Sequence, residues 1–145
     1  MAQVIVTAGR EVAGSPQQVR AALADYTQTR PKILTEKFSD YQVREGGSGA
    51  GTKVAWKFAA TSKRVRDQLV EVSEPGDGSI VESDANSSMV TTWNVEDAGS
   101  GRSRVSVRTT WDGAGGIGGF FERTFAPKGL RRVYDEMIGK LDGLV

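Results

Sequence analysis

The chain contains neither cysteine nor histidine among its 145 residues. Without cysteine it has no disulfide, no thiolate nucleophile and no thiolate metal ligand. Without histidine it has no Ser-His or Cys-His catalytic pair, and it lacks both a common zinc ligand and the commonest general base near neutral pH. We therefore predict no metal site, and nothing in the sequence calls for a cofactor.

The chain also lacks an excess of charge of either sign. Its 19 Lys and Arg residues nearly balance 18 Asp and Glu residues, which gives a net charge of +1. Such a balance offers no bulk attraction to nucleic acid or to an anionic membrane. There is no run of apolar residues of membrane-spanning length, and residues 1–7 do not resemble a secretory signal. We expect a single domain over residues 1–145, cytoplasmic and not inserted in a membrane, and its length is compatible with a partner subunit.

Residues 4–34 predict a strand followed by two short helices. Val4, Val6, Ala8 and Val12 alternate as in a half-buried strand, and the alternation stops at residues 14–16. Ser15 followed by Pro16 is typical of a helix start, with a capping side chain and then a residue whose φ is already set. We expect this helix to bury Val19, Ala22, Leu23 and Tyr26. After a break at residues 25–31, a second short helical turn is expected near Ile33.

From residue 38 onward the pattern predicts six strands connected by turns. The expected strands lie around Phe38–Val43, which has the irregular spacing of a bulge, and at Val54–Phe58, Lys63–Glu74, Ile80–Asp84, Met89–Val95 and Val105–Trp111. Within the third of these, Val70 and Val72 share their parity with Arg66 and Gln68. We therefore expect a polar side chain to face inward there. Half-buried alternation throughout predicts an antiparallel sheet with one apolar face.

A glycine-rich turn and a helical pattern end the chain. Residues 130–141 carry one apolar stripe, whereas Phe120 and Phe121 belong to a second stripe that is out of phase with it. Pro127 lies between the stripes, so we expect either a kink or a short aromatic helix followed by a new helix. Residues 113–118 match the dinucleotide fingerprint G-x-G-x-x-G, but no second parallel strand follows, and we interpret the match as a structural turn.

These elements predict an α+β fold in which a curved, seven-stranded antiparallel sheet wraps around a long C-terminal helix. The arrangement resembles the helix-grip fold of the START and Bet v 1-like (SRPBCC) superfamily, and within it the bacterial polyketide cyclase/dehydrase-like proteins. The resemblance covers the whole chain and is clearest in Val12-Ala13-Gly14-Ser15-Pro16-Gln17-Gln18-Val19 with Leu23-Ala24-Asp25-Tyr26. A tryptophan that often follows the Asp in this family is missing, since Thr29-Arg30-Pro31 stands there. These are markers of fold and carry no chemistry.

Large aromatic side chains on the expected inner face of the sheet and on the helix are the most suggestive feature. They are typical of a core, and equally of a core that also forms the wall of a pocket for a flat or lipidic molecule. The polar residues that could orient such a ligand are Arg66, Asp67, Gln68 and Tyr134. As candidate ligand-binding residues we select Trp56, Phe58, Arg66, Gln68, Trp93, Trp111, Phe120, Phe121 and Tyr134.

Three functions remain open at this stage. We favour binding of a hydrophobic small molecule, such as a lipid, a polyketide or an isoprenoid, in a cavity between the sheet and the terminal helix. The first alternative, implied by the resemblance, is a cyclase or dehydratase, in which Asp67, Tyr134 or a neighbouring carboxylate would serve as acid or base and an arginine would polarise a carbonyl. The second is a protein-interaction module, as some helix-grip relatives are.

Overall fold

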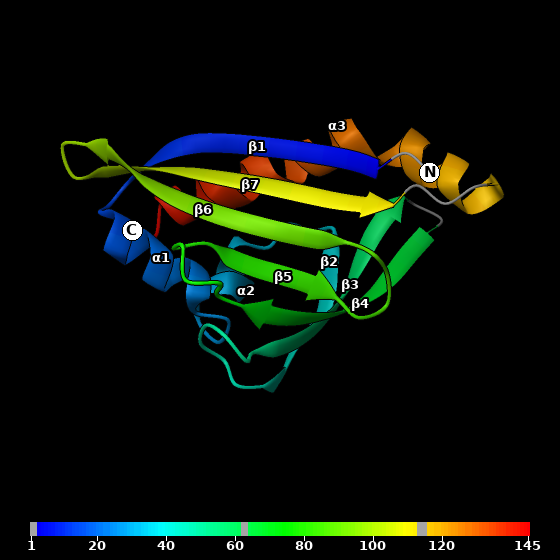
Figure 1. Cartoon of the computed structure of the whole chain (residues 1–145), viewed down its shortest axis with the longest axis horizontal. Helices are drawn as coiled ribbons and strands as arrows, with labels where there is room; N and C mark the ends of the chain where they lie inside the picture. Colours follow the sequence, from blue (N-terminus) through cyan, green and yellow to red (C-terminus); the bar gives the residue numbers. More distant parts are fainter. Residues whose placement is uncertain (1–2, 62–63, 113–115) are drawn as a thin grey trace.

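The computed structural model describes residues 3–61, 64–112 and 116–145, with the side chains of residues 60–64 and 113–127 outside the description. The elements follow the predicted order (Figure 1). They are β1 (Gln3–Ala13), α1 (Pro16–Ala24), α2 (Thr29–Ile33), β2 (Phe38–Glu45), β3 (Lys53–Thr61), β4 (Arg64–Ser73), β5 (Ile80–Asp84), β6 (Val90–Gly99), β7 (Arg102–Asp112) and α3 (Gly116–Asp142).

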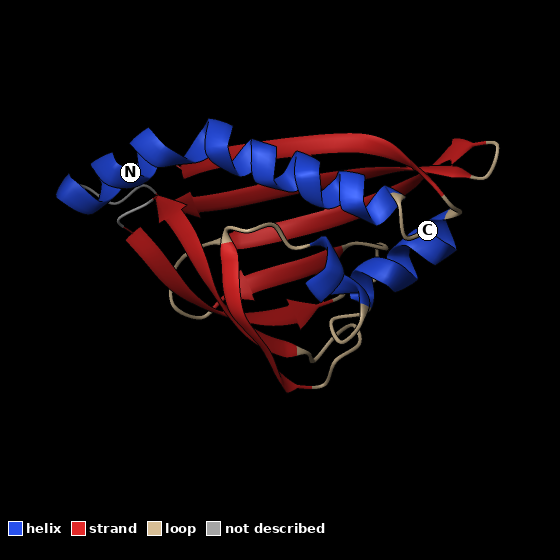
Figure 2. Cartoon of the chain, turned by 180° about the vertical axis from the view of Figure 1, so that it is seen from behind, coloured by secondary structure: helices blue, strands red, loops and turns tan. Residues whose placement is uncertain are grey.

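The strands form one seven-stranded sheet in the order β1-β7-β6-β5-β4-β3-β2, and every neighbouring pair is antiparallel. Figure 2 shows α3 lying along one face of this curved sheet, with α1 and α2 closing the end near its C-terminus. The predicted helix-grip arrangement is confirmed. All the described strand pairs are antiparallel, whereas a dinucleotide-binding βαβ unit needs parallel strands. Residues 113–115 of the G-x-G-x-x-G match lie outside the described residues.

Because side chains alternate along each strand, every second side chain lies on the face of the sheet that α3 covers. Trp93 on β6 lies opposite Val107 on β7, which in turn lies opposite Ala8 on β1. The helix supplies the other half of the core with the predicted apolar stripe, all of it buried: Leu130, Val133, Tyr134, Met137, Ile138 and Leu141. One helix face and one sheet face therefore share a single apolar core.

Helix α3 runs across Pro127 as one element from Gly116 to Asp142. The expectation of two successive helices is therefore wrong. A proline inside a helix lacks the N–H that would bond to the preceding turn, and the flanking turns maintain the helix on both sides. The aromatic stripe with Phe120 and Phe121 lies in the part of α3 whose side chains are outside the description.

The predicted irregularity of β2 is also present. Its register with β3 shifts between Ser39 and Gln42 and again between Val43 and Glu45, and Asp40 has a positive φ of 53°. Bulges of this kind bend a strand and increase its twist. They turn the β2 edge of the sheet toward the C-terminal half of α3.

Ser15 caps α1 as predicted. Its Oγ accepts a hydrogen bond of 3.2 Å from the backbone N–H of Gln18, and the Gln18 side chain accepts one of 3.0 Å from the Ser15 N–H. Replacing Ser15 with Ala should lower the free energy of unfolding by about 1 kcal/mol, because it leaves helix N–H groups unpaired. Urea unfolding measures this, with Ser73→Ala, at the exposed end of β4, as a control. An equal cost for both variants would contradict the role of the cap.

Candidate functional site

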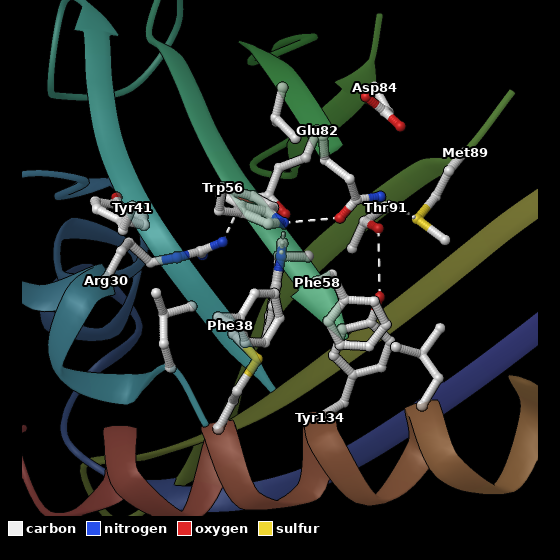
Figure 3. A pocket seen from close by; sticks show the side chains of 16 residues that line it. Arg30, Phe38, Tyr41, Trp56, Phe58, Glu82, Asp84, Met89, Thr91 and Tyr134 are labelled. Atoms are coloured by element: carbon white, nitrogen blue, oxygen red, sulfur yellow. Dashed lines mark hydrogen bonds and ion pairs between the residues drawn. The ribbon is translucent and has the colours of Figure 1, made fainter. Parts of the chain in front are cut away.

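A cavity lies between the inner face of the sheet and α3 (Figure 3). Its walls come from α2, from the five strands β2–β6 and from the middle of α3. It is lined by Arg30, Leu34, Phe38, Tyr41, Trp56, Phe58, Gln68, Val70, Glu82, Asp84, Met89, Thr91, Trp93, Leu130, Tyr134 and Met137. The space open to the centre of a water-sized sphere is about 40 Å³, whereas one water needs about 10–15 Å³ by the same measure. In this conformation the cavity has room for a few waters.

Five of the nine candidate residues lie on this cavity: Trp56, Phe58, Gln68, Trp93 and Tyr134. Trp111 is buried at the end of β7 but does not line it, and Arg66 is half-buried on the inner side of β4 without lining it. The side chains of Phe120 and Phe121 are outside the described part of the structure. Sequence periodicity therefore identified which side chains lie on the inner face of the sheet. It was less reliable in identifying which of them lie at the level of the cavity along their strands.

Aromatic rings pack against one another where β2 meets β3. Phe38 makes an edge-on contact with Trp56, with ring centroids 5.8 Å apart, and Tyr41 stacks parallel to Trp56 at 6.2 Å. Phe38 also lies 5.0 Å from Phe58. Such ring pairs contribute more than their buried area alone. The sequence pattern marked Phe38 and Tyr41 as strand residues and missed their place in this wall.

A buried ion pair that the sequence analysis did not identify lies at the α2 end of the cavity. Arg30 on α2 is 3% exposed and Glu82 on β5 is 6% exposed, and an Nη of Arg30 donates to Oε2 of Glu82. Glu82 also accepts hydrogen bonds from the Tyr26 hydroxyl at 2.5 Å and from Nε1 of Trp93 at 3.0 Å. The Arg30 guanidinium lies over the rings of Tyr26 and Trp93, 4.7 and 5.0 Å from their centroids.

Charge compensation explains how this pair can be buried. Burial by itself lowers the pKa of Arg30, but the neighbouring Glu82 carboxylate raises it, and the net effect is a pKa above the ordinary value. For the Tyr26 phenol, burial and then the Glu82 charge both raise the pKa. The guanidinium therefore stays charged, the phenol stays neutral, and the pair adds no net charge to the cavity.

Two signals in the sequence pointed to this pair. Arg30 stands in the segment where the resembling family often has a tryptophan, and Glu82 shares its strand parity with Ile80, which is buried. An acidic residue in phase with a buried one on a half-buried strand needs an internal partner. That partner lies 52 positions away in the sequence, so periodicity alone does not identify it.

A second polar group is formed by three hydroxyls under α3. Tyr134 exchanges a hydrogen bond with Thr109 on β7 and one of 3.4 Å with Thr91 on β6, and the two threonines are 2.8 Å apart. Burial raises the pKa of Tyr134 to about 12, with the threonine hydrogen bonds acting in the opposite direction. At neutral pH this phenol is protonated and acts as a hydrogen-bonding group.

Gln68 joins the aromatic wall to β6. Its side-chain oxygen accepts a 2.7 Å hydrogen bond from Nε1 of Trp56, and its amide nitrogen lies 3.1 Å from the sulfur of Met89. The predicted inward polar residue of β4 is therefore Gln68, which is 6% exposed. Its neighbour Asp67 is exposed on the outer face, where it lies opposite Lys57. The expectation that Asp67 could act inside the cavity is wrong, because adjacent strand residues point to opposite faces.

Asp84, the remaining acidic residue of the wall, supports the turn between β5 and β6. It accepts hydrogen bonds from the backbone N–H groups of Leu69 and Asn86 and from the Ser87 hydroxyl, at 3.0, 3.1 and 2.7 Å. The described residues do not bring together three acidic, histidine or cysteine side chains that could hold a metal ion. Apolar and aromatic surface dominates the cavity, and its charged groups already have partners within the protein.

Comparison with known proteins agrees with this architecture. The family model described as "Polyketide cyclase / dehydrase and lipid transport" matches residues 3–145. The chain belongs to this family. An NMR solution structure of the KanY protein shares 49% sequence identity with it, covering 99% of this chain and 98% of KanY, with a TM-score of 0.89. No curated protein matches the chain significantly.

More distant structures with this fold belong to differently named proteins. The Zhui aromatase/cyclase from Streptomyces sp. R1128 is 13% identical over 99% of this chain and 93% of its own, with a TM-score of 0.79. A START superfamily protein from Mycobacterium smegmatis is 11% identical over 97% and 96% of the two chains, with a TM-score of 0.66. At such identities the likeness shows the helix-grip fold alone. Within the part of this family member that the structure describes, no helix has both the length and the apolarity to span a membrane.

Proposed function

We propose that this protein binds a hydrophobic small molecule, a lipid, a polyketide or an isoprenoid-like compound, between its sheet and α3. The observation that carries the proposal is the composition of the cavity wall. Aromatic rings and flexible thioethers supply half of its lining residues, and its polar groups hydrogen-bond mainly to one another. An apolar guest would gain from burial without leaving these polar groups unpaired.

Binding requires the cavity to widen. Its open space of about 40 Å³ is small beside the roughly 300–1,000 Å³ of typical ligand pockets. Met89 and Met137 line the wall, and methionine side chains change shape at low cost because they are unbranched and have three rotatable bonds. We therefore expect these methionine side chains to move when a guest binds.

The same wall favours binding over acid–base catalysis. A general acid or base works best with a pKa near the working pH, but burial raises the pKa of Tyr134 to about 12. The Glu82 carboxylate is occupied by three donors, from Tyr26, Arg30 and Trp93. A cyclase or dehydratase of the type in the family description would have to release one of these groups first.

Two adjacent positions on β4 test the proposal. Val70 is buried and lines the cavity, whereas Leu69 points to the outer face of the sheet. Val70→Phe should weaken binding of the neutral fluorophore Nile red at least about tenfold, since the added ring occupies the guest's space. Leu69→Phe introduces the same ring on the outer face and should leave binding unchanged. Fluorescence titration measures both, and native mass spectrometry of the purified wild-type protein should reveal a co-purified apolar compound.

Equal Nile red binding by the wild type and Val70→Phe would overturn the proposal. Circular dichroism establishes that each variant is folded. If Val70→Phe does not fold, Met137→Phe replaces it, because phenylalanine is close to methionine in volume but far stiffer. Met137 is buried and also lines the cavity.

A further inference from the structure

A second cleft lies on the opposite side of Phe58 from the cavity. It is bounded by the segment before β2, the end of β3 and the outer edge of α3, and about 230 Å³ is open to the centre of a water-sized sphere. Its lining residues are Thr35, Glu36, Lys37, Phe58, Ala59, Gly129, Arg132, Val133 and Glu136. Phe58 lines both spaces, so this side chain is part of the wall of the apolar interior and of the wall of this cleft.

Backbone hydrogen bonds hold the walls of the cleft in place. The Ala59 N–H donates to the Lys37 carbonyl at 2.8 Å, and the Thr35 hydroxyl accepts from the Lys37 N–H at 3.2 Å. On α3, Val133 faces the cleft while Leu130 and Tyr134 face the cavity. One turn of the helix therefore borders both spaces, and displacement of the Phe58 ring would join them.

The cleft and the cavity differ in how their charges are compensated. Inside, Arg30 and Glu82 pair directly. In the cleft, the exposed side chains of Lys37, Arg132 and Glu36 form no ion pair with another described residue. The Glu136 carboxylate lies 3.8 Å from Nζ of Lys140. The lining of the cleft has two cationic and two anionic side chains. Because Glu136 is already paired with Lys140, Glu36 is the one described carboxylate of the lining left to oppose both Lys37 and Arg132.

We infer that the natural ligand is an amphiphile with one carboxylate, whose apolar body occupies the cavity and whose carboxylate lies in the cleft against Arg132 and Lys37. The inference rests on the proposed function. An arginine fork binds a carboxylate with two parallel hydrogen bonds, and such charge-assisted bonds are about twice as strong as neutral ones. Among the described residues that line the cavity, the guanidinium is that of Arg30, and it already bonds to Glu82.

A matched pair of competitors tests the inference. Dodecanoic acid and dodecan-1-ol have the same chain length and differ in the charge of the end group, and each can compete with Nile red. The wild type should prefer the acid at least about tenfold at low salt, with the preference decreasing as salt rises. Arg132→Gln should reduce the preference to about threefold or less and leave the affinity for the alcohol unchanged.

Arg108→Gln serves as the control, because it makes the same charge change at an exposed position on the outer face of β7. It should retain the preference of the wild type. Equal affinity of the wild type for acid and alcohol, or an equal loss of preference in both arginine variants, would overturn the inference while Nile red binding upholds the proposed function. Failure of Nile red itself to bind the wild type would instead overturn the proposed function.

Discussion

Glu82→Gln is expected to lower the free energy of unfolding by about 3–5 kcal/mol, the cost of leaving a buried charge without its partner. Glutamine keeps the size of the side chain and one acceptor oxygen for Tyr26 or Trp93, but it removes the negative charge facing Arg30. The guanidinium is 3% exposed and cannot reach bulk water without opening the α2 end of the cavity. Urea unfolding followed by circular dichroism measures the loss.

Two further variants separate charge from packing. Arg30→Met combined with Glu82→Leu replaces both charges by apolar groups and should recover part of the lost stability, since a buried ion pair contributes little beyond its apolar equivalent. Recovery should be incomplete, because Tyr26 and Trp93 lose their shared acceptor. Glu45→Gln breaks the exposed pair with Lys53, whose charged atoms are 3.6 Å apart, and should cost less than about 1 kcal/mol. A cost below about 1 kcal/mol for Glu82→Gln would show that Arg30 does not depend on Glu82.

Local patterns predicted the fold because each element carries its own signal. Ser15 and Pro16 mark the start of α1, and the alternation of Val54, Trp56 and Phe58 marks the inner face of β3. These signals act over two to four residues, the range in which strand and helix periodicity operates. The sequence left open whether the helix is kinked at Pro127 or ends there, and the structure has one element across it.

The candidate site was predicted only in part, because a cavity depends on how elements curve together. Trp111 has the same parity on β7 as the buried Val107, yet it lies at the β1 end of the sheet opposite Val4, away from the cavity between β2–β6 and α3. In the sequence Glu82 is in phase with the buried Ile80, but no local pattern identifies Arg30 as its partner. Their pairing follows from the packing of α2 against the sheet, which no short-range pattern encodes.

The pairing also controls how the protein responds to alkali, because all three tyrosines of the chain lie close to it. Burial, and then the Glu82 charge, raises the pKa of Tyr26. Burial likewise raises the pKa of Tyr41, whose hydroxyl donates to the Tyr26 carbonyl at 2.5 Å, with Arg30 acting in the opposite direction. Burial raises the pKa of Tyr134 to about 12. Every phenol in the folded protein therefore holds its proton more tightly than a free tyrosine, which ionises near pH 10.

Ultraviolet absorbance should accordingly detect no tyrosinate in the folded protein at about pH 10–11, where a free phenol is already ionised. The unfolded chain releases these protons first, so stability is fully present below about pH 10 and is lost as the pH rises through the folded pKa values. The two most buried phenols, Tyr26 and Tyr134, should together give a slope of about 3 kcal/mol per pH unit above pH 10. All three phenols should then ionise together in one cooperative unfolding transition.

Tyr41→Phe is the control for the least buried of the three phenols, and it should reduce the absorbance change at unfolding by about one third while leaving the transition cooperative. A tyrosine that titrates near pH 10 while circular dichroism still reports the folded state would contradict the prediction. It would mean that solvent reaches the ring of Tyr26, Tyr41 or Tyr134 without unfolding, and that the interior is more open than its rings and its ion pair indicate.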